Sequence, residues 1–335
     1  MITVVSTTQA ISVNKSDNQI QIDVTTLPIR AIEQQEVLVE CHFSSVNYKD
    51  KLICSGNPGL VRKFPCVPGI DACGIVRESM SDEFAPGDKV MSIATPFGCN
   101  IPGGWSRYFI INSKYLMKIP QDIELFEAAA LGTAGFTSLL AVFTLEKHLL
   151  SNTSAPVLIT AGTSGVGSFA IRYLKSRGFK VHTVIRDGRD DGFVRTLGAD
   201  ENYIDRDFCN ALKFPLLKET YSAVIDNLGG PVLSCAIRKV ISNGGVAMVG
   251  IAASETLSVS IMPFILRGVT AYGINAEGTD SETRRKIWSE VAKYKEKIGI
   301  QSLYTITPYH DLPKCPDALS KHAPGRQVIS FQKTS

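Results

Sequence analysis

The chain has 335 residues, of which 44% are hydrophobic and 20% are charged. At about 150 residues per domain this length predicts two domains, and the composition excludes disordered, collagen-like and coiled-coil proteins. The net charge is +3, from 35 basic and 32 acidic residues, which indicates neither a nucleic-acid nor a membrane partner. No apolar stretch approaches the ~20 residues of a membrane span and no secretory signal is visible, so we expect a cytoplasmic protein.

Eight cysteines are dispersed along the chain, and none belongs to a C-x-x-C pair. Dispersed thiols without an export signal are typical of a reduced protein rather than of a disulfide framework. Because a structural zinc site needs clustered soft ligands, we expect no structural zinc.

Residues 1–125 are predicted to form mostly short strands. Apolar and polar positions partly alternate in the expected strand at 36–43, and Gly or Pro turns lead into the expected strands at 69–76, 89–93 and 105–111. Many short strands joined by such turns indicate a barrel-like β domain.

From residue 126 onward, helical segments alternate with short apolar runs. Buried strands are expected at 156–160, 180–185, 223–225, 246–249 and 270–274. This alternation predicts an α/β domain with a doubly wound parallel sheet over residues 126–268. Residues 269–335 are expected to complete that sheet and then return to the β domain.

A glycine-rich loop follows the strand at 156–160 and opens a helix. Its residues are Gly162, Thr163, Ser164, Gly165, Val166 and Gly167. Small side chains let the backbone approach a pyrophosphate, and a helix N-terminus offers free N–H groups and the positive end of its dipole. With a strand before it, a helix after it and a second strand about 20 residues on, the loop predicts dinucleotide binding.

The residues after the second strand bear on which dinucleotide is bound. An NAD site usually has an acid there for the ribose 2′-hydroxyl, whereas this chain has Arg186 and Arg189. Cations at this place favour the 2′-phosphate of NADP. Two alternatives stay open. Asp187 would repel a phosphate if it pointed inward, and both arginines can be solvated loop charges.

Three features resemble the medium-chain dehydrogenase/reductase family. They are the turn and strand at 86–90, Gly103-Gly104 before an aromatic strand, and the glycine loop. The order of β domain, nucleotide domain and short return matches over essentially the whole chain. The resemblance implies a GroES-like β-barrel catalytic domain and a Rossmann domain.

The zinc enzymes of that family have a Cys, a His-Glu pair after Pro-Gly, and a second Cys. At the corresponding places this chain has Asn47, Ile70-Asp71 and Gly132-Thr133. None of these supplies an imidazole or a thiolate, so the resemblance implies a zinc-free reductase.

Within the zinc-free branch, four stretches resemble the acrylyl-CoA reductase group, which includes the YhdH-type quinone oxidoreductases. They lie at 45–50, 67–71, 132–137 and 262–267. The resemblance implies NADPH-dependent reduction of an activated C=C bond in an enone or an acryloyl-CoA-like enoyl thioester. It also implies a homodimer joined through an edge strand of the cofactor domain. The group's usual Ser-Gly-Arg is Ile185-Arg186-Asp187 here.

Without a metal, hydrogen-bond donors must stabilise the charge that develops on the substrate's carbonyl oxygen. We expect Tyr48 to contact the nicotinamide ribose or donate to the enolate, and Asn47 to orient substrate. The alternative for Tyr48 is a half-buried aromatic residue with an internally bonded hydroxyl. Arg326 is expected to meet an anionic substrate, or else to be a surface arginine. The resemblance implies further cofactor contacts from Thr133, Thr137, Asn227, Gly250, Ile251, Ile265 and Asn275.

Two rival functions remain. One is an NADPH:quinone reductase, and the other is a non-catalytic NADPH-binding sensor or interaction protein. Retention of the glycine loop together with Asn47 and Tyr48 argues against the second rival.

Overall fold

The computed structural model describes residues 5–16, 19–61, 63–99, 101–151, 154–186, 191–209, 214–314 and 324–332. The chain divides into two compact units, Met1–Thr133 with Ile300–Ser335, and Ala134–Gly299. The predicted boundary at 125/126 lies at the start of helix α2 (Leu125–Thr144), whereas the division between the units falls inside that helix.

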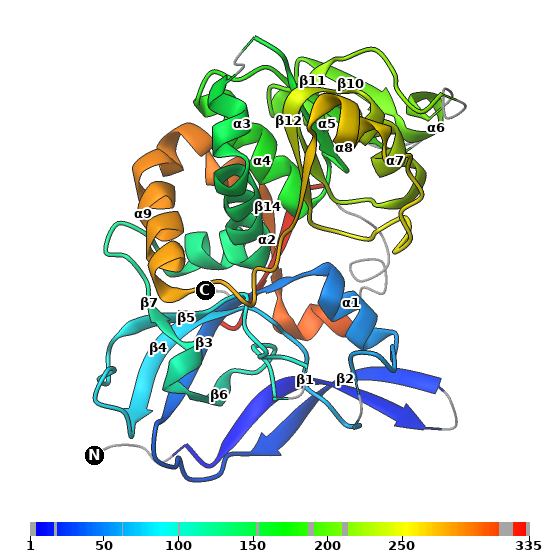
Figure 1. Ribbon diagram of the computed structural model, residues 1–335. Helices are drawn as coiled ribbons and strands as arrows, with labels where there is room; N and C mark the ends of the chain where they lie inside the picture. Colours follow the sequence, from blue (N-terminus) through cyan, green and yellow to red (C-terminus); the bar gives the residue numbers. More distant parts are fainter. Residues whose placement is uncertain are drawn as a thin grey trace. The chain divides into compact units, whose positions relative to one another are not determined.

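The first unit is built on β3 (Glu36–Val46), a strand that is buried at almost every position. It pairs antiparallel with β4, β6 and β15, and β15 pairs parallel with β14. The sheet has the order β14-β15-β3-β4-β5-β7, while β1 and β2 form a separate two-stranded sheet (Figure 1). The other strands are β1 Thr7–Ser16, β2 Gln19–Pro28, β4 Ala72–Ser79, β5 Lys89–Ser92, β6 Tyr108–Asn112, β7 Met117–Lys118, β14 Tyr304–Pro308 and β15 Arg326–Ser330.

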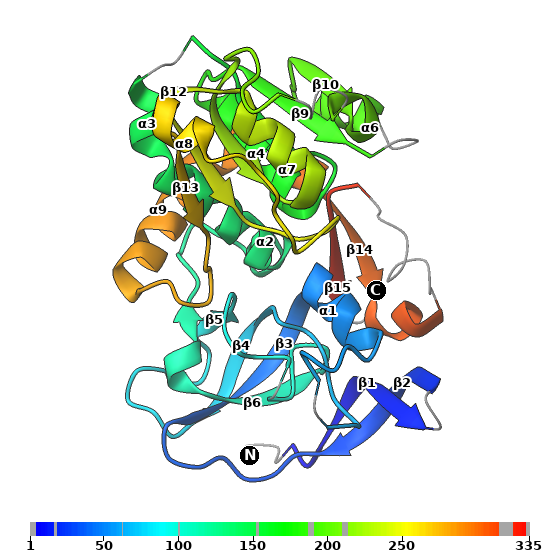
Figure 2. The same ribbon diagram turned by 45° about the vertical axis from the view of Figure 1, so that its right-hand side comes forward.

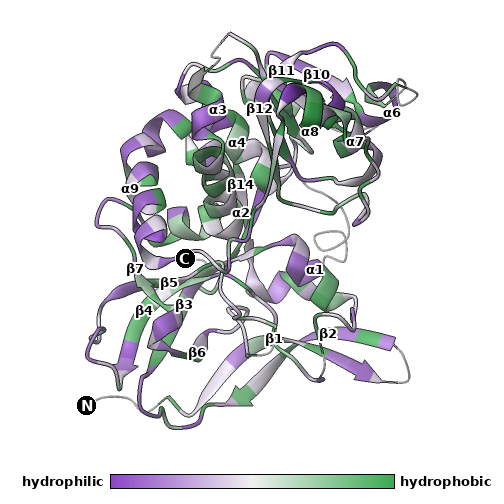
Figure 3. Ribbon diagram, viewed as in Figure 1, coloured by the Kyte–Doolittle hydropathy of each residue, from purple (hydrophilic) through white to green (hydrophobic). Residues whose placement is uncertain are grey.

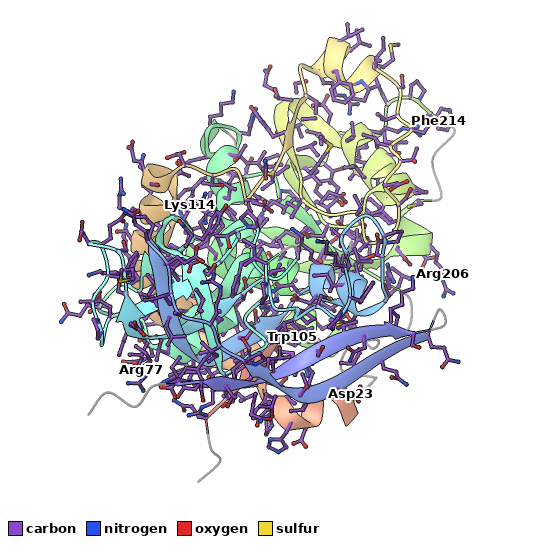
Figure 4. All side chains as sticks on the ribbon, turned by 90° about the horizontal axis from the view of Figure 1, so that it is seen from below. Asp23, Arg77, Trp105, Lys114, Arg206 and Phe214 are labelled. Atoms are coloured by element: carbon purple, nitrogen blue, oxygen red, sulfur yellow. The ribbon has the colours of Figure 1, made fainter. Side chains whose placement is uncertain are left out.

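Trp105 lies fully buried in the core of this unit, where Figure 4 labels it, and Arg77 lies at the unit's outer edge. The Trp105 ring packs against Gly69, on which a Cβ would lie 2.5 Å from Trp105 Cδ1. Gly69 has a φ of 102°, which favours glycine. The strand predicted at 69–76 therefore begins only at Ala72, because residues 69–71 make the bend that seats Trp105.

The second unit holds a six-stranded sheet of order β10-β9-β8-β11-β12-β13, in which every pairing is parallel. The strands are β8 Val157–Thr160, β9 Val181–Ile185, β10 Glu201–Ile204, β11 Tyr221–Asp226, β12 Val240–Met248 and β13 Thr270–Gly273. β8 and β11 are buried throughout, as central strands of a sheet covered on both faces must be. The predicted fold class, a GroES-like β domain with a doubly wound α/β domain, is confirmed.

Helices cover both faces of the parallel sheet. α3, α4 and α9 lie on one face, and α6 and α7 lie on the other (Figures 1 and 2). Figure 3 shows α9 as largely hydrophilic, in agreement with its charged sequence. The remaining helices are α1 Tyr48–Cys54, α3 Glu146–Ser151, α4 Gly165–Ser176, α5 Asp191–Thr196, α6 Asp205–Phe208, α7 Gly230–Arg238, α8 Met262–Arg267 and α9 Ser281–Ile298, with 3-10 turns at η1 Ser113–Tyr115, η2 Ile300–Ser302 and η3 Tyr309–Lys314.

Helix α2 is long and apolar enough to cross a membrane by length and composition alone. No apolar stretch of this length was expected from the sequence, and the helix reaches it by continuing through Gly132, where the backbone is non-helical. In the structure 83% of its most apolar stretch is buried inside the protein. Its apolar side chains are therefore accounted for as those of a core helix.

Candidate functional site

The glycine loop of the second unit, residues 161–167, joins β8 to α4. A Cβ on Gly162 would lie 2.1 Å from Thr183 Oγ1, and one on Gly167 would lie 2.3 Å from the carbonyl oxygen of Ala161. Ser164 caps α4, because its Oγ accepts a hydrogen bond from Gly167 N at 3.0 Å. The glycines are therefore required by close packing of strand, loop and helix.

The start of α4 is accessible to a ligand. The predicted phosphate contacts Thr163, Gly165 and Val166 are partly exposed. N–H groups in a first helical turn have no partner within the helix, and the positive end of the helix dipole adds to their attraction for an anion. This turn can therefore bind a phosphate group.

The end of β11, next to β8, carries an acid and an amide. Asp226 is buried and accepts hydrogen bonds from Thr160 Oγ1 and Gly229 N, both at 2.7 Å, and burial raises its pKa. Asn227 donates from Nδ2 to the carbonyl oxygen of Thr160 at 2.7 Å. Among the described residues, Asn227 Oδ1 is buried without a hydrogen-bond partner. Such an acceptor, beside the glycine loop, suits a ligand that brings a donor.

Arg186 follows β9 and is half-buried. Its Nη2 donates to the carbonyl oxygen of Ala252 at 2.6 Å, so the guanidinium reaches from the end of β9 to the loop that follows β12. Its predicted partner Arg189 lies outside the described residues. Gly250, in the same loop as Ala252, fits closely against Asn227, since a Cβ there would lie 2.6 Å from the Asn227 carbonyl oxygen.

The other predicted cofactor contacts of this unit differ in exposure. Ile251 and Ile265 are exposed, whereas Thr137 is buried in α2. Asn275 is exposed, and its Oδ1 accepts a hydrogen bond from Gly278 N at 3.1 Å in the turn after β13. Ile251, Ile265 and Asn275 are accessible to a ligand, and their contacts with cofactor stay predictions.

In the first unit, Asn47 is the N-cap of α1 and Tyr48 is its first residue. The Asp50 carboxylate accepts hydrogen bonds from the backbone N–H groups of Asn47 at 2.9 Å and of Gly69 and Ile70 at 3.0 Å, which fastens α1 to the bend before β4. Tyr48 is 46% exposed, and its hydroxyl has no hydrogen-bond partner in the described part of the chain. This hydroxyl is therefore available to a ligand.

Beneath the start of α1 lies a set of side chains that we call the buried polar cluster. Its members are Ser45, Asn47, Asp50, Asp71, Thr133 and Arg326. Asp71 is fully buried, and its Oδ2 accepts hydrogen bonds from Ser45 Oγ at 2.6 Å and Asn47 Nδ2 at 2.8 Å. Its Oδ1 accepts a hydrogen bond from Thr133 Oγ1 at 2.6 Å.

Arg326 is 4% exposed and directs all its donors into this unit. Nε donates to the carbonyl oxygen of Ala130 at 3.0 Å. Nη1 donates to the carbonyl oxygen of Val46 at 3.1 Å and to Asn47 Oδ1 at 2.9 Å. Nη2 donates to Ser45 Oγ at 2.6 Å and to Asp71 Oδ2 at 3.3 Å. Arg326 is therefore not a surface residue, and the structure leaves none of its N–H groups for the anionic substrate that the sequence suggested.

Asn47 and Thr133 are also engaged within the unit. The amide of Asn47 lies between Arg326 and Asp71 and is 8% exposed. The hydroxyl of Thr133 donates to Asp71 and accepts a hydrogen bond from Ala94 N at 2.9 Å. Their contacts with substrate and cofactor stay predictions, and the structure shows their side chains holding the cluster together.

The buried polar cluster contains two carboxylates and one cation. Burial raises the pKa of Asp50 to about 6, although its three backbone N–H partners favour the ionised form. Burial lowers the pKa of Arg326, and the charges of Asp71 and Asp50 oppose that shift. A guanidinium stays protonated at physiological pH, so Arg326 balances Asp71 while Asp50 titrates near pH 6.

The side chains at this place do not fit a zinc ion. Arg326 already supplies the positive charge beside Asp71, with Nη2 3.3 Å from Oδ2. A Cβ on Gly132 would lie 2.3 Å from Asp71 Oδ2 and 2.6 Å from Arg326 Nη2, so no ligating side chain can enter from that position. Within the described ranges, no three His, Cys, Asp or Glu side chains are grouped as metal ligands.

Three members of the buried polar cluster were not predicted as site residues from the sequence: Ser45, Asp50 and Asp71. All three lie in the stretches at 45–50 and 67–71 that carry the resemblance to the acrylyl-CoA reductase group. The sequence offered one signal, Asp71 in a run of apolar and small residues. An acid in such a run is expected to be buried and therefore to need a partner.

In comparison with known proteins, residues 33–121 match the family model described as the alcohol dehydrogenase GroES-like domain, and residues 165–293 match the one described as zinc-binding dehydrogenase. Acrylyl-CoA reductase AcuI of Ruegeria pomeroyi is 33% identical over 310 residues, 92% of each chain. Other relatives are named quinone oxidoreductases, such as the chloroplast envelope quinone oxidoreductase homolog of Arabidopsis thaliana, 34% identical over 66% of this chain and 68% of its own.

Solved structures match over nearly the whole chain. The yhdH oxidoreductase from Salmonella enterica in complex with NADP has a TM-score of 0.90 and 30% identity, covering 97% of this chain and 100% of its own. The Bacillus subtilis protein yhfP with NAD bound has a TM-score of 0.91 and 29% identity, covering 98% of this chain and 100% of its own. Nicotinamide dinucleotides of both kinds are therefore found in similar structures.

Proposed function

The chain belongs to the medium-chain dehydrogenase/reductase family of oxidoreductases, and we propose that it is an NADPH-dependent reductase of activated C=C bonds. The proposed substrate is an enone or an enoyl thioester of the acryloyl-CoA kind. The observation that carries the proposal is Tyr48, whose exposed hydroxyl has no hydrogen-bond partner among the described residues and stands on a helix start that Asp50 and Asn47 hold in place.

In the second unit, the first turn of α4 would bind the pyrophosphate of the dinucleotide. Arg186 would pair with the 2′-phosphate, in exchange for its hydrogen bond to Ala252. Asn227 Oδ1 would accept a hydrogen bond from a cofactor hydroxyl or amide, which would supply the partner that it lacks within the described chain. When bound, the reduced nicotinamide supplies a hydride.

Hydride addition to the β-carbon of such a substrate leaves negative charge on its carbonyl oxygen. A donor already oriented toward that oxygen lowers the barrier most, because it needs no rearrangement as the charge forms. We assign this donor to Tyr48. Asn47 and Arg326 would act by fixing α1, and the proton for the α-carbon would come from water.

The second candidate function is reduction of a quinone, which the names of several relatives favour. A quinone also develops negative charge on a carbonyl oxygen, so the same Tyr48 donor would serve. The third candidate is a cofactor-binding protein without catalysis. Oxidation of NADPH, followed in parallel with acryloyl-CoA, a simple enone and a naphthoquinone, separates the three. Tight NADPH binding without turnover of any acceptor would leave only the third.

The substitution Tyr48→Phe tests the donor. We expect kcat to fall about 100-fold with NADPH affinity unchanged, as when one oxyanion donor is removed. Tyr108→Phe, on β6 and outside the buried polar cluster, is the matched control. An unchanged kcat in Tyr48→Phe would show that Tyr48 is not the donor.

We also propose a cytoplasmic homodimer. In the described part of the second unit β13 pairs on one side only, with β12, and an unpaired edge strand is a ready surface for a second copy. Exposed apolar side chains gather in and before α8, which contacts β12: Ile261, Met262, Ile265 and Leu266. Analytical ultracentrifugation should show a dimer that Leu266→Glu converts to monomer, and a monomeric wild-type protein would contradict this assembly.

A further inference from the structure

Arg326 reaches the buried polar cluster from the far end of the chain. β15 begins at Arg326 and lies between β14 and β3 in the sheet. This position brings the side chain against segments that are remote in sequence, since Asp71 is 255 residues away along the chain. The C-terminal strand thus completes a cluster whose other members come from the first 133 residues.

Each N–H donor of the Arg326 guanidinium has its own acceptor in this unit. An arginine has five N–H donors in a fixed plane. The five acceptors are the carbonyl oxygens of Ala130 and Val46, Asn47 Oδ1, Ser45 Oγ and Asp71 Oδ2. A lysine ammonium has three donors at one point and cannot reproduce this arrangement.

The cluster also needs a cation for reasons of charge. Asp71 and Asp50 are both fully buried, and a buried carboxylate without a counter-charge is strongly unfavourable. The space beside Asp71 where a metal ligand would enter is filled, because a Cβ on Gly132 would lie within 2.6 Å of Arg326 Nη2. A metal ion and Arg326 therefore cannot both lie beside Asp71 as the counter-charge of its carboxylate.

We infer that Arg326 is a fixed cation that takes the place of a metal ion in this unit, and that it is the positioning residue for α1. By holding Asn47 Oδ1 at 2.9 Å it fixes the N-cap of α1, and the next residue is Tyr48. Its effect on turnover passes through Asn47 and Tyr48. This kinetic part rests on the proposed function, whereas the cation role does not.

The test compares Arg326→Ala and the milder Arg326→Lys and Arg326→Gln with Arg107→Ala. Arg107 is the matched control, because it also ties the C-terminal segment to this unit, through the Phe331 carbonyl oxygen at 2.6 Å, without touching the cluster. We expect Arg326→Ala to lower the melting temperature by about 10 °C. We expect kcat to fall about 100-fold while NADPH affinity stays within about threefold.

Added guanidinium ion, far below denaturing concentrations, should raise both the melting temperature and kcat of Arg326→Ala, and should restore neither in Arg107→Ala. Wild-type protein should contain no stoichiometric zinc by elemental analysis, and a chelator should not alter its melting temperature. Stoichiometric zinc, or an Arg326→Ala protein that melts like wild type, would overturn the inference. So would equal, unrescued losses in Arg326→Ala and Arg107→Ala.

The melting temperature and the metal content do not depend on turnover. A wild-type protein that reduces none of the three acceptors would therefore count against the proposed function and leave the cation role to be decided by those two measurements. If Arg326→Ala does not fold, Arg326→Lys and Arg326→Gln are compared with wild type instead. Both should have a lower melting temperature than wild type. Wild-type melting temperatures in both variants would overturn the inference.

Discussion

The two units solve the problem of buried polar groups in opposite ways. In the first unit, all five donors of Arg326 and both oxygens of Asp71 have partners within the protein. In the second unit, Asn227 Oδ1 lacks a partner among the described residues, and the first turn of α4 ends in N–H groups without helical partners. The first arrangement, which we call the scaffold, satisfies its buried polar groups without a ligand. The second leaves polar groups that a ligand can bind.

The largest expected effect tests whether the scaffold depends on its charges. Asp71→Asn keeps the shape of the side chain but removes the carboxylate charge that the buried Arg326 guanidinium contacts. We expect the free energy of unfolding to fall by about 3–5 kcal/mol, measured by urea denaturation. Asp88→Asn breaks only the exposed pair with Lys118 and should cost about 1 kcal/mol or less. Equal losses in the two variants would remove the distinction between the cluster and the surface.

A pH series tests the second carboxylate of the scaffold. Burial raises the folded-state pKa of Asp50 from 3.8 to about 6. Between about pH 4 and pH 6 the folded protein therefore keeps a proton that the unfolded chain releases, so the contribution of Asp50 to stability falls as pH rises through this window. Two pKa units correspond to at most about 3 kcal/mol.

This contribution is measured by urea denaturation at pH 4.5 and 7.5. Compared with Asp50→Asn, the wild-type protein should lose more free energy of unfolding between these two values. Asp88→Asn should respond to pH almost as wild type does over this window, since the hydrogen bond from Lys118 lowers the pKa of Asp88 and both its folded and its unfolded forms are mostly ionised above pH 4.5. An identical pH response in wild type and Asp50→Asn would mean that Asp50 is ionised throughout.

In the second unit, Gly167→Ala should weaken NADPH binding about 100-fold. The new Cβ would lie 2.3 Å from the backbone carbonyl oxygen of Ala161 and would displace the glycine loop from the start of α4. Isothermal titration calorimetry measures the loss. Gly273→Ala is the control in the same unit, since no atom lies within 4 Å of its Cβ position. Comparable losses in both variants would argue against a specific role of the loop.

The smallest expected effect concerns cofactor choice. Arg186→Ala should lower NADPH affinity about tenfold to 100-fold and leave NADH affinity unchanged, because a charge-assisted hydrogen bond to the 2′-phosphate is lost. Arg195→Ala, an exposed arginine on α5, serves as the control. An unaltered ratio of NADPH to NADH affinity would assign the preference to another residue and would fit a protein that, like yhfP, is found with NAD.

Some features were predictable because their causes are local. The glycine loop before a helix and the buried strands of the parallel sheet each follow from neighbouring residues, and the structure has that helix as α4 and two of those strands as β8 and β11. The start of the predicted strand at 69–76 was misplaced because the packing of Trp105 on Gly69, a contact between distant segments, sets the bend. Local periodicity carries no information about such a contact.

The sequence by itself determined the two-part fold class, the place of the glycine loop, and the absence of imidazole and thiolate side chains where zinc enzymes of the family have them. Only the tertiary structure showed which side chains occupy the place of the zinc ligands. It turned Arg326 from an expected surface or substrate contact into the buried partner of Asp71, and it left the Tyr48 hydroxyl without a hydrogen-bond partner in the described part of the chain. The reason is that the charge balance of a buried cluster is set by which distant strands pair, and β15 joins β3 across nearly the whole length of the chain.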